Sequence, residues 1–221
     1  MSVLVKICGL STPETLDAAL DAGADLVGFV FFPASPRNVS FLAARELGAR
    51  VNARAEKVAL TVDADDATLA NIVDVLRPDL LQLHGKETPA RVGAIAQRFG
   101  LPVMKALPIE TKADLGAIPP YLKVVDRLLF DARAPREATR PGGLGKPFDW
   151  QLLERLDLSV PFTLGGGLDP ENVAEAIRIT RAPAVDVSSG VESAPGVKDP
   201  DKIRAFIRAA RTSQGASLPV G

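Results

Sequence analysis

The chain has 221 residues, of which 47% are hydrophobic and 24% charged, and its formal net charge is -1. This length and balance fit one large soluble α/β domain, and the lack of a basic excess argues against nucleic acid as a partner. The single cysteine, Cys8, excludes an intrachain disulfide. No signal-peptide pattern is present, and the longest apolar strand core, residues 26–32, is too short to cross a bilayer. We therefore expect a cytoplasmic protein without a membrane partner.

Segments typical of strands and helices alternate along the chain. The strand patterns are short β-branched and apolar runs, and the helix starts carry Ser, Thr or Asp caps, often followed by proline. Strands are predicted at residues 3–7, 25–32, 57–62, 79–83, 101–106, 127–130, 160–164 and 184–187. Helices are predicted to start at Pro13, near Phe41, Asp65 and Thr88, and at Asp149, Asp169 and Asp199. A further helix before Pro119 is weak, because Gly116 and two prolines crowd it.

Eight strand–helix units in one domain predict a (β/α)₈ TIM barrel over residues 1–211, followed by a disordered tail at 212–221. A doubly wound open sheet is the competing fold. Its dinucleotide-binding form carries Gly-x-Gly-x-x-Gly after the first strand, where this chain has Cys8-Gly9-Leu10-Ser11. That fingerprint is therefore absent, which favours the barrel.

Two small-residue clusters follow the seventh and eighth predicted strands. The first is Gly165-Gly166-Gly167 and the second is Ser188-Ser189-Gly190. In barrel enzymes the loops after these two strands commonly bind phosphate through backbone N–H groups. The alternative is that the glycines only form tight turns. The pairing of the clusters at consecutive strands favours a phosphate site, with Gly166, Gly167, Ser188, Ser189 and Gly190 as its residues.

Cys8 and Asp131 end the first and sixth strands, so both should face the mouth of the barrel, where a thiol and a carboxyl can act as a base and an acid. The alternatives are a small buried hydrophobe for the cysteine and a helix cap for the aspartate. Side chains alternate along a strand, so Lys6 points the same way as Cys8; if that way is inward, Lys6 is buried and needs an opposite charge. Asp186 on the neighbouring eighth strand is the predicted partner. A cation here should also favour the Cys8 thiolate and lower its pKa.

Two other side chains follow strands at the same end. Arg37, in the loop after the second strand, can hold a carboxylate through two parallel hydrogen bonds, or can be a solvated surface charge. His84 either lines the mouth or caps the fourth strand, and as the only histidine it cannot belong to a multi-histidine metal site. The loop at 131–148 contains a glycine run without the Ser or Thr of a nucleotide loop, and we interpret it as a lid.

Ordered motifs over nearly the whole chain resemble those of the phosphoribosylanthranilate isomerase family, the cofactor-free isomerases of tryptophan biosynthesis. The first motif is Lys6-Ile7-Cys8-Gly9 and the last is at residues 195–199. The others lie at residues 25–31, 35–37, 81–85, 130–131, 145–150, 166–173 and 186–192. The resemblance implies a phosphate-binding TIM barrel that isomerises N-(5'-phosphoribosyl)anthranilate to 1-(2-carboxyphenylamino)-1-deoxyribulose 5-phosphate in an Amadori rearrangement.

The resemblance also assigns roles to the residues that match the family motifs. It implies that Cys8 is the general base, that Asp131 is the general acid and that Arg37 binds the anthranilate carboxylate. It implies no metal and no cofactor. The expected partner is a small phosphosugar substrate, and both a monomer and a homodimer fit barrels of this type.

Other phosphate-binding barrels are the rival interpretations. A sugar-phosphate epimerase usually needs metal-binding His and Asp residues, and the chain has one histidine. An indole-glycerol-phosphate synthase needs a lysine and glutamate set that we cannot place. A bifunctional sugar isomerase uses paired aspartates, and Cys8 replaces the first. A binding protein that has lost catalysis is the non-enzyme alternative, against which the presence of both Cys8 and Asp131 argues.

Overall fold

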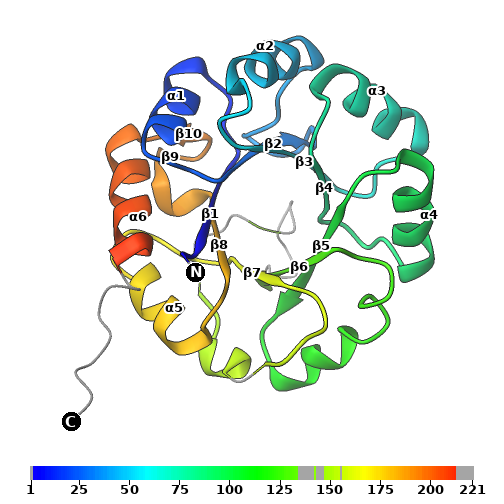
Figure 1. The fold of residues 1–221 in the computed structure, drawn as a ribbon, viewed down its shortest axis with the longest axis vertical. Helices are drawn as coiled ribbons and strands as arrows, with labels where there is room; N and C mark the ends of the chain where they lie inside the picture. Colours follow the sequence, from blue (N-terminus) through cyan, green and yellow to red (C-terminus); the bar gives the residue numbers. More distant parts are fainter. Residues whose placement is uncertain (1, 134–141, 143–146, 155, 213–221) are drawn as a thin grey trace.

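The computed structural model describes residues 2–133, 142, 147–154 and 156–212. Eight parallel strands follow one another in chain order and close into a barrel, because β1 also pairs with β8. Figure 1 looks into this barrel and shows the helices around its outside. The strands are β1 (Leu4–Cys8), β2 (Leu26–Phe31), β3 (Glu56–Thr61), β4 (Leu80–Leu83), β5 (Val103–Ile109), β6 (Arg127–Ala132), β7 (Phe162–Leu164) and β8 (Ala184–Val187). The predicted TIM barrel is confirmed, and the open sheet is excluded because its edge strands would stay unpaired.

Four α-helices of the described residues start where the capping pattern predicts. The side chains of Thr12, Ser40, Asp65 and Thr88 each accept a hydrogen bond from the backbone N–H three residues later. Each cap satisfies one of the N–H groups that the first turn leaves without a helical partner. The helices are α1 (Pro13–Asp21), α2 (Phe41–Val51), α3 (Asp66–Leu76), α4 (Pro89–Phe99), α5 (Val173–Thr180) and α6 (Pro200–Thr212).

Three of the predicted helices differ from the structure in type or start. The helix predicted from Asp149 is the short 3₁₀ helix η2 (Trp150–Leu153), which ends after one turn because the backbone of Glu154 leaves the helical conformation, with ψ 126°. The helix predicted from Asp169 begins at Val173, because Asp169 and Asn172 form a side-chain-capped turn before it. The weak helix before Pro119 is also a 3₁₀ helix, η1 (Lys112–Ala117).

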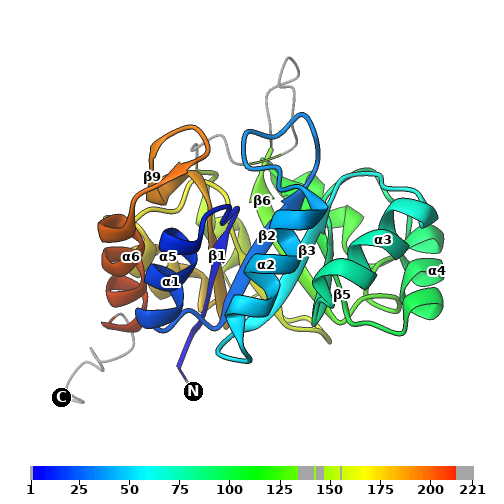
Figure 2. The ribbon, with the colours of Figure 1, turned by 90° about the horizontal axis from the view of Figure 1, so that it is seen from above.

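A β-hairpin after β8 was not predicted from the sequence. After the 3₁₀ helix η3 (Ser189–Val191), the strands β9 (Glu192–Ala194) and β10 (Val197–Lys198) pair antiparallel. Gly196 in its turn has φ +83°, and a Cβ there would lie 2.6 Å from the carbonyl oxygen of Pro36. The hairpin therefore packs closely against the loop after β2. Figure 2 shows both at the same end of the barrel, opposite the start of β1.

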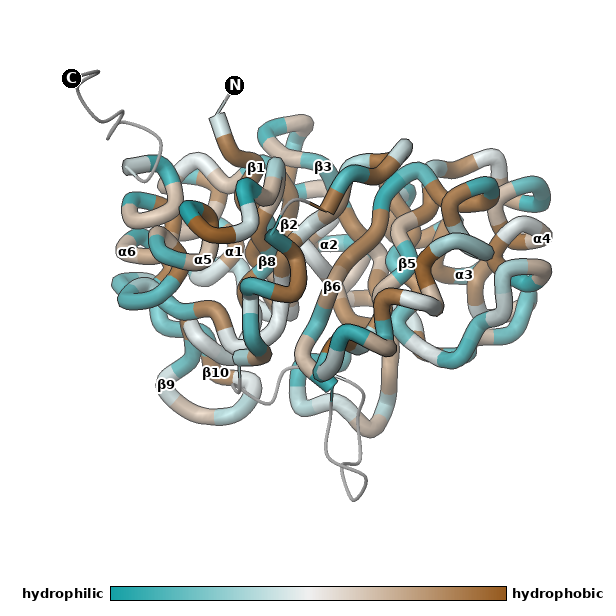
Figure 3. Tube along the Cα trace, turned by 90° about the horizontal axis from the view of Figure 1, so that it is seen from below, coloured by the Kyte–Doolittle hydropathy of each residue, from teal (hydrophilic) through white to brown (hydrophobic). Residues whose placement is uncertain are grey.

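The interior of the barrel changes from apolar to polar along its axis. The side chains that form its apolar inner cluster are Leu26, Val58, Leu80, Met104, Ala106 and Leu129. Nearer the carboxyl ends of the strands the buried side chains include Lys6, Gln82 and Asp131. Figure 3 shows the hydrophobic colouring concentrated along the strands. Burying polar side chains costs free energy unless they are paired. A group of them at the carboxyl ends of the strands therefore indicates a functional site there.

Two predicted segments fall largely outside the described residues. The predicted lid at 131–148 begins within β6, which continues to Ala132, and residues 134–141 and 143–146 are not described. The predicted tail at 212–221 is likewise not described, except for Thr212, which ends α6. Among the described residues, no helix is long and apolar enough to cross a membrane.

Candidate active site

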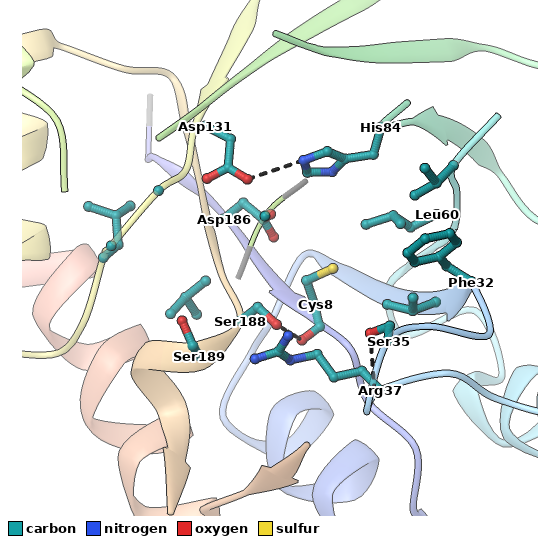
Figure 4. Close-up of a pocket in the computed structure, with 17 residues that line it drawn as sticks. Cys8, Phe32, Ser35, Arg37, Leu60, His84, Asp131, Asp186, Ser188 and Ser189 are labelled. Carbon is teal, nitrogen blue, oxygen red and sulfur yellow. Dashed lines mark hydrogen bonds and ion pairs between the residues drawn. The ribbon is translucent and has the colours of Figure 1, made fainter. Parts of the chain in front are cut away.

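A pocket opens at the carboxyl ends of the strands and encloses about 660 Å³ of empty space, part of which is open to solvent. It is lined by residues of β1, β2, β3, β6 and β8 and of the loops that follow β2, β3, β4, β6, β7 and β8 (Figure 4). The sequence-predicted residues that line it are Cys8, Arg37, His84, Asp131, Gly166, Gly167, Ser188 and Ser189. Gly190 does not line it, because it packs against the carbonyl oxygen of Leu168, with which a Cβ would collide.

Cys8 sits above a buried ion pair. The Lys6 Nζ donates to Asp186 Oδ1 at 2.8 Å, and the two residues are paired in register on β1 and β8. The predicted Lys6–Asp186 pair is confirmed. Gly28, in register with Cys8 on β2, leaves the space for this arrangement. A Cβ at Gly28 would lie 3.0 Å from Cys8 Sγ and 3.2 Å from Lys6 Nζ.

The ionisation of this group differs from the prediction. Burial raises the pKa of the Cys8 thiol, and the nearby Lys6 ammonium opposes that shift without reversing it. The prediction of a lowered pKa is therefore wrong, because removal of the thiol from water outweighs the cation. Burial also works to lower the pKa of Lys6, but Asp186 and Cys8 outweigh it and hold the pKa above its usual value. Lys6 therefore stays charged beneath the thiol.

Asp131 faces the same pocket from β6, joined to His84. His84 Nε2 lies 3.1 Å from Asp131 Oδ2, and both side chains are about nine-tenths buried. The other carboxylate oxygen, Oδ1, accepts from the backbone N–H of Ala132 at 2.9 Å. Figure 4 shows this pair in the same pocket as Cys8. Both oxygens of the carboxyl are thus held by neighbouring donors.

Arg37 is buried, so the interpretation as a solvated surface charge is wrong. Its Nε and Nη2 donate to the two oxygens of Glu192, at 2.6 and 2.8 Å. Lys198 Nζ donates to the same carboxylate at 2.8 Å. Burial works to raise the pKa of Glu192, but Arg37 and Lys198 outweigh it and hold the pKa below its usual value. This places one carboxylate between two cations at the edge of the pocket.

The Ser188 hydroxyl belongs to the same network. It donates to the carbonyl oxygen of Cys8 at 3.2 Å, while Lys198 Nζ lies 3.1 Å from it and donates to the Ser188 carbonyl at 2.8 Å. Burial lowers the pKa of Lys198, although Glu192 opposes the shift. Ser188 therefore ties the end of β8 to the end of β1, directly beside the thiol.

The loop after β7 needs glycine because of its backbone conformation and its close packing. Gly166 and Gly167 have φ of +80° and +69°, in the left-handed region that favours glycine. A Cβ at Gly166 would collide with the backbone nitrogen of Ala132 and lie 3.0 Å from Asp131 Oδ1. The loop after β7 therefore lies against the aspartate, and a glycine lets its backbone approach so closely.

Four site residues were missed by sequence reasoning: Gly28, Gln82, Glu192 and Lys198. Glu192 and Lys198 lie in the hairpin that was not predicted, so nothing indicated that they meet Arg37. Gly28 left no pattern, since it has no side chain. Gln82 could have been predicted, because side chains alternate along a strand and Gln82 therefore points inward from β4 on the same side as His84.

Residues 5–209 match the family of N-(5'-phosphoribosyl)anthranilate (PRA) isomerases. An N-(5'-phosphoribosyl)anthranilate isomerase from Bradyrhizobium diazoefficiens is 70% identical over 217 residues, covering 98% of this chain and 97% of the relative. This chain belongs to the PRA isomerase family. The prediction of a PRA isomerase of tryptophan biosynthesis is confirmed.

Solved structures of PRA isomerases share the fold. That of the Thermotoga maritima isomerase is 36% identical, has a TM-score of 0.85 and covers 95% of this chain and 99% of its own. A second PRA isomerase structure, 34% identical with a TM-score of 0.81 and the same coverage, is a complex with reduced 1-(o-carboxyphenylamino)-1-deoxyribulose 5-phosphate. The family and the barrel are therefore supported by sequence and by structure independently.

Proposed function

We propose that this chain isomerises N-(5'-phosphoribosyl)anthranilate with Cys8 as the general base and Asp131 as the general acid. The observation that carries this assignment is their shared pocket: the two side chains reach it from β1 and β6, across the mouth of the barrel. A substrate between them would have a base on one side and an acid on the other.

The chemistry follows from these two groups. Asp131 gives a proton to the furanose ring oxygen, the bond from that oxygen to C1 breaks, and the nitrogen lone pair forms an iminium. The Cys8 thiolate then takes the proton from C2, and the C–H electrons form the C1–C2 double bond of the enolamine while the iminium becomes an amine. The enolamine takes up a proton at C1 and loses the proton of its C2 hydroxyl, which gives the ketone. Because burial raises the pKa of Cys8, the thiolate is the minor form near neutral pH and a strong base once formed.

The anionic groups of the substrate have cationic surroundings. We assign the anthranilate carboxylate to Arg37, and the phosphate to Gly166, Gly167, Ser188 and Ser189 in the loops after β7 and β8. Gly190, which does not line the pocket, holds these two loops together through its close packing against Leu168. In support, the carboxylate of Glu192 lies between the buried cations of Arg37 and Lys198, which leaves a positive excess beside Ser188. The complex of a related isomerase with a reduced product analogue is consistent with an anionic ligand.

Turnover of purified variants tests the two catalytic roles. We expect Cys8→Ala and Asp131→Asn each to lower kcat by about 10²- to 10⁴-fold with a modest change in KM, as for loss of one acid or base. Loss of substrate fluorescence follows the reaction. Asp74→Asn, an exposed change on α3, is the matched control and should leave kcat unchanged. Normal turnover in either variant would refute its role, and inactivity of the unmodified chain would favour a phosphosugar-binding protein.

Assembly and location are further proposals. The chain is proposed to be a cytoplasmic monomer or homodimer that takes a small phosphosugar. Sedimentation velocity measures the assembly state, and fractionation of the producing cells measures the location.

A further inference from the structure

Gln82 is a polar side chain at the border between the apolar inner cluster and the polar layer of the barrel interior. It is fully buried on β4, two residues after Leu80, which belongs to the apolar inner cluster. Its Nε2 lies 3.1 Å from Nδ1 of His84, and its Oε1 is buried without a hydrogen-bond partner among the described residues. A buried amide oxygen without a partner destabilises a fold. A glutamine here therefore needs a reason other than stability.

The hydrogen bond from Gln82 determines where His84 carries its proton. An amide nitrogen only donates, so Nδ1 of the ring must accept, and a neutral imidazole then carries its hydrogen on Nε2. That Nε2 faces Asp131 Oδ2 at 3.1 Å. The Nε2–H therefore donates to the carboxyl oxygen, and the chain of bonds runs in one direction from Gln82 through His84 to Asp131.

The backbone that carries His84 is held from below by a second buried pair. Lys105 Nζ donates to Glu87 Oε2 at 2.9 Å and to the carbonyl oxygens of Leu83 and Gly85, the two neighbours of His84, at 3.2 and 2.7 Å. Glu87 also accepts from the backbone N–H of Gly85 at 2.9 Å. The His84 N–H donates to the carbonyl oxygen of Thr61 at 2.9 Å. The ring is thus presented from a fixed backbone.

We propose that Gln82 and His84 are positioning residues for Asp131: Gln82 holds His84 as the Nε2–H tautomer, and that N–H fixes the orientation of the Asp131 carboxyl toward the substrate. The inference rests on the proposed role of Asp131 as the acid. Neither residue needs to touch the reacting atoms. The arrangement is that of a functional group oriented by a histidine whose own tautomer is set by a further partner.

Nitrogen NMR of the histidine ring tests the tautomer directly. His84 is the only histidine of the chain, so an untagged protein labelled with ¹⁵N-histidine gives one ring to observe. At mildly alkaline pH we expect a protonated Nε2 and an unprotonated Nδ1. In Gln82→Met, which keeps the length and removes the amide, we expect a mixture of both tautomers. A protonated Nδ1 in the unmodified protein would overturn the proposal.

Kinetics of four variants separate positioning from packing. We expect Gln82→Met to lower kcat by at least about tenfold, as for other partners that orient a functional histidine, with KM within twofold and an unchanged or higher Tm. Leu80→Met, a volume-conserving change on the same face of β4, is the matched control and should keep its kcat. His84→Gln offers an N–H near the position of Nε2 and should retain most of the turnover, whereas the shorter His84→Asn should not.

Three outcomes would overturn the proposal: an unchanged kcat in Gln82→Met, an equal loss in Leu80→Met, or no advantage of His84→Gln over His84→Asn. If Gln82→Met does not fold, the comparison of the two His84 variants decides. The NMR result does not depend on catalysis. Full turnover in Asp131→Asn would therefore refute the proposed acid while the tautomer of His84 was still measured.

Discussion

Replacing Lys6 with methionine removes the cation beneath Cys8 and leaves Asp186 without its ion-pair partner. Lys6 is almost completely buried, and its Nζ lies 2.8 Å from Asp186 Oδ1. Removal of one partner from a buried pair costs about 3–5 kcal/mol. At about 2–4 °C per kcal/mol for a domain of this size, the Tm of Lys6→Met should fall by about 6–20 °C.

The same substitution should raise the pKa of the thiol further. Burial already raises the pKa of Cys8, and Lys6 is the largest opposing influence. An ammonium next to a thiolate favours the charged form of the thiol, and the effect is strongest where water is excluded. Since the thiolate is the charged form, losing the cation moves its formation, and with it the rise in turnover, to higher pH.

Alkylation by iodoacetamide measures this shift, because Cys8 is the only thiol. The pH midpoint of the alkylation rate should be highest for Lys6→Met, which loses the cation and keeps the anion. It should be intermediate for Lys6→Met/Asp186→Asn, which loses both charges, and lowest for the unmodified protein. The double variant should also regain part of the lost Tm. Equal midpoints in all three proteins would refute the electrostatic link between Lys6 and the thiol.

Three further substitutions test the walls of the pocket. Arg37→Ala should raise KM by about 10- to 100-fold, as for lost charge-assisted hydrogen bonds, with a smaller effect on kcat; an unchanged KM in steady-state kinetics would remove the carboxylate assignment. Gly28→Ala places a Cβ 3.0 Å from Cys8 Sγ. We therefore expect a lower kcat and a loss of about 1–3 kcal/mol in the free energy of unfolding, measured with urea. An unchanged kcat and an unchanged free energy of unfolding would show that β2 shifts to accommodate the added methyl group. Gly166→Ala is incompatible with φ +80° and with the Ala132 backbone, and should lower both Tm and kcat; a protein as stable and active as the parent would contradict the close approach of this loop.

Strand parity predicted more of the site than composition did. Lys6 and Asp186 lie 180 residues apart in the chain, yet alternation along β1 and β8 and closure of the barrel were enough to predict their contact. The same alternation placed Cys8 on the face of β1 that carries Lys6. These predictions succeeded because the period of a strand and the order of strands in a closed barrel leave few other arrangements.

The predictions that failed needed information that a strand pattern does not contain. The pKa of Cys8 depends on the balance between burial and the charges of Lys6, Asp186 and Lys198, which come from three separate segments. The partner of Arg37 was missed because β9 and β10 have three and two residues, too few for a period of two to be seen. The helix predicted at Asp149 rested on its capping residue alone, and a cap does not determine where a helix ends.

The strands of the site share a feature that explains why its side chains are held so firmly. On β1, β4 and β8, an inward polar residue lies two positions before the residue at the pocket: Lys6 before Cys8, Gln82 before His84, and Asp186 before Ser188. Each of the three inner residues is buried or nearly so. Lys6 and Asp186 form an ion pair with each other, and Gln82 hydrogen-bonds to His84, the pocket residue two positions after it. Polar groups in a barrel interior weaken the apolar core. Because these polar residues lie directly beneath the pocket, they orient the groups that face the substrate, at the expense of some stability of the apolar core. A polar residue two positions before a pocket residue, inward on a barrel strand, is thus the sequence signal that would have found Gln82.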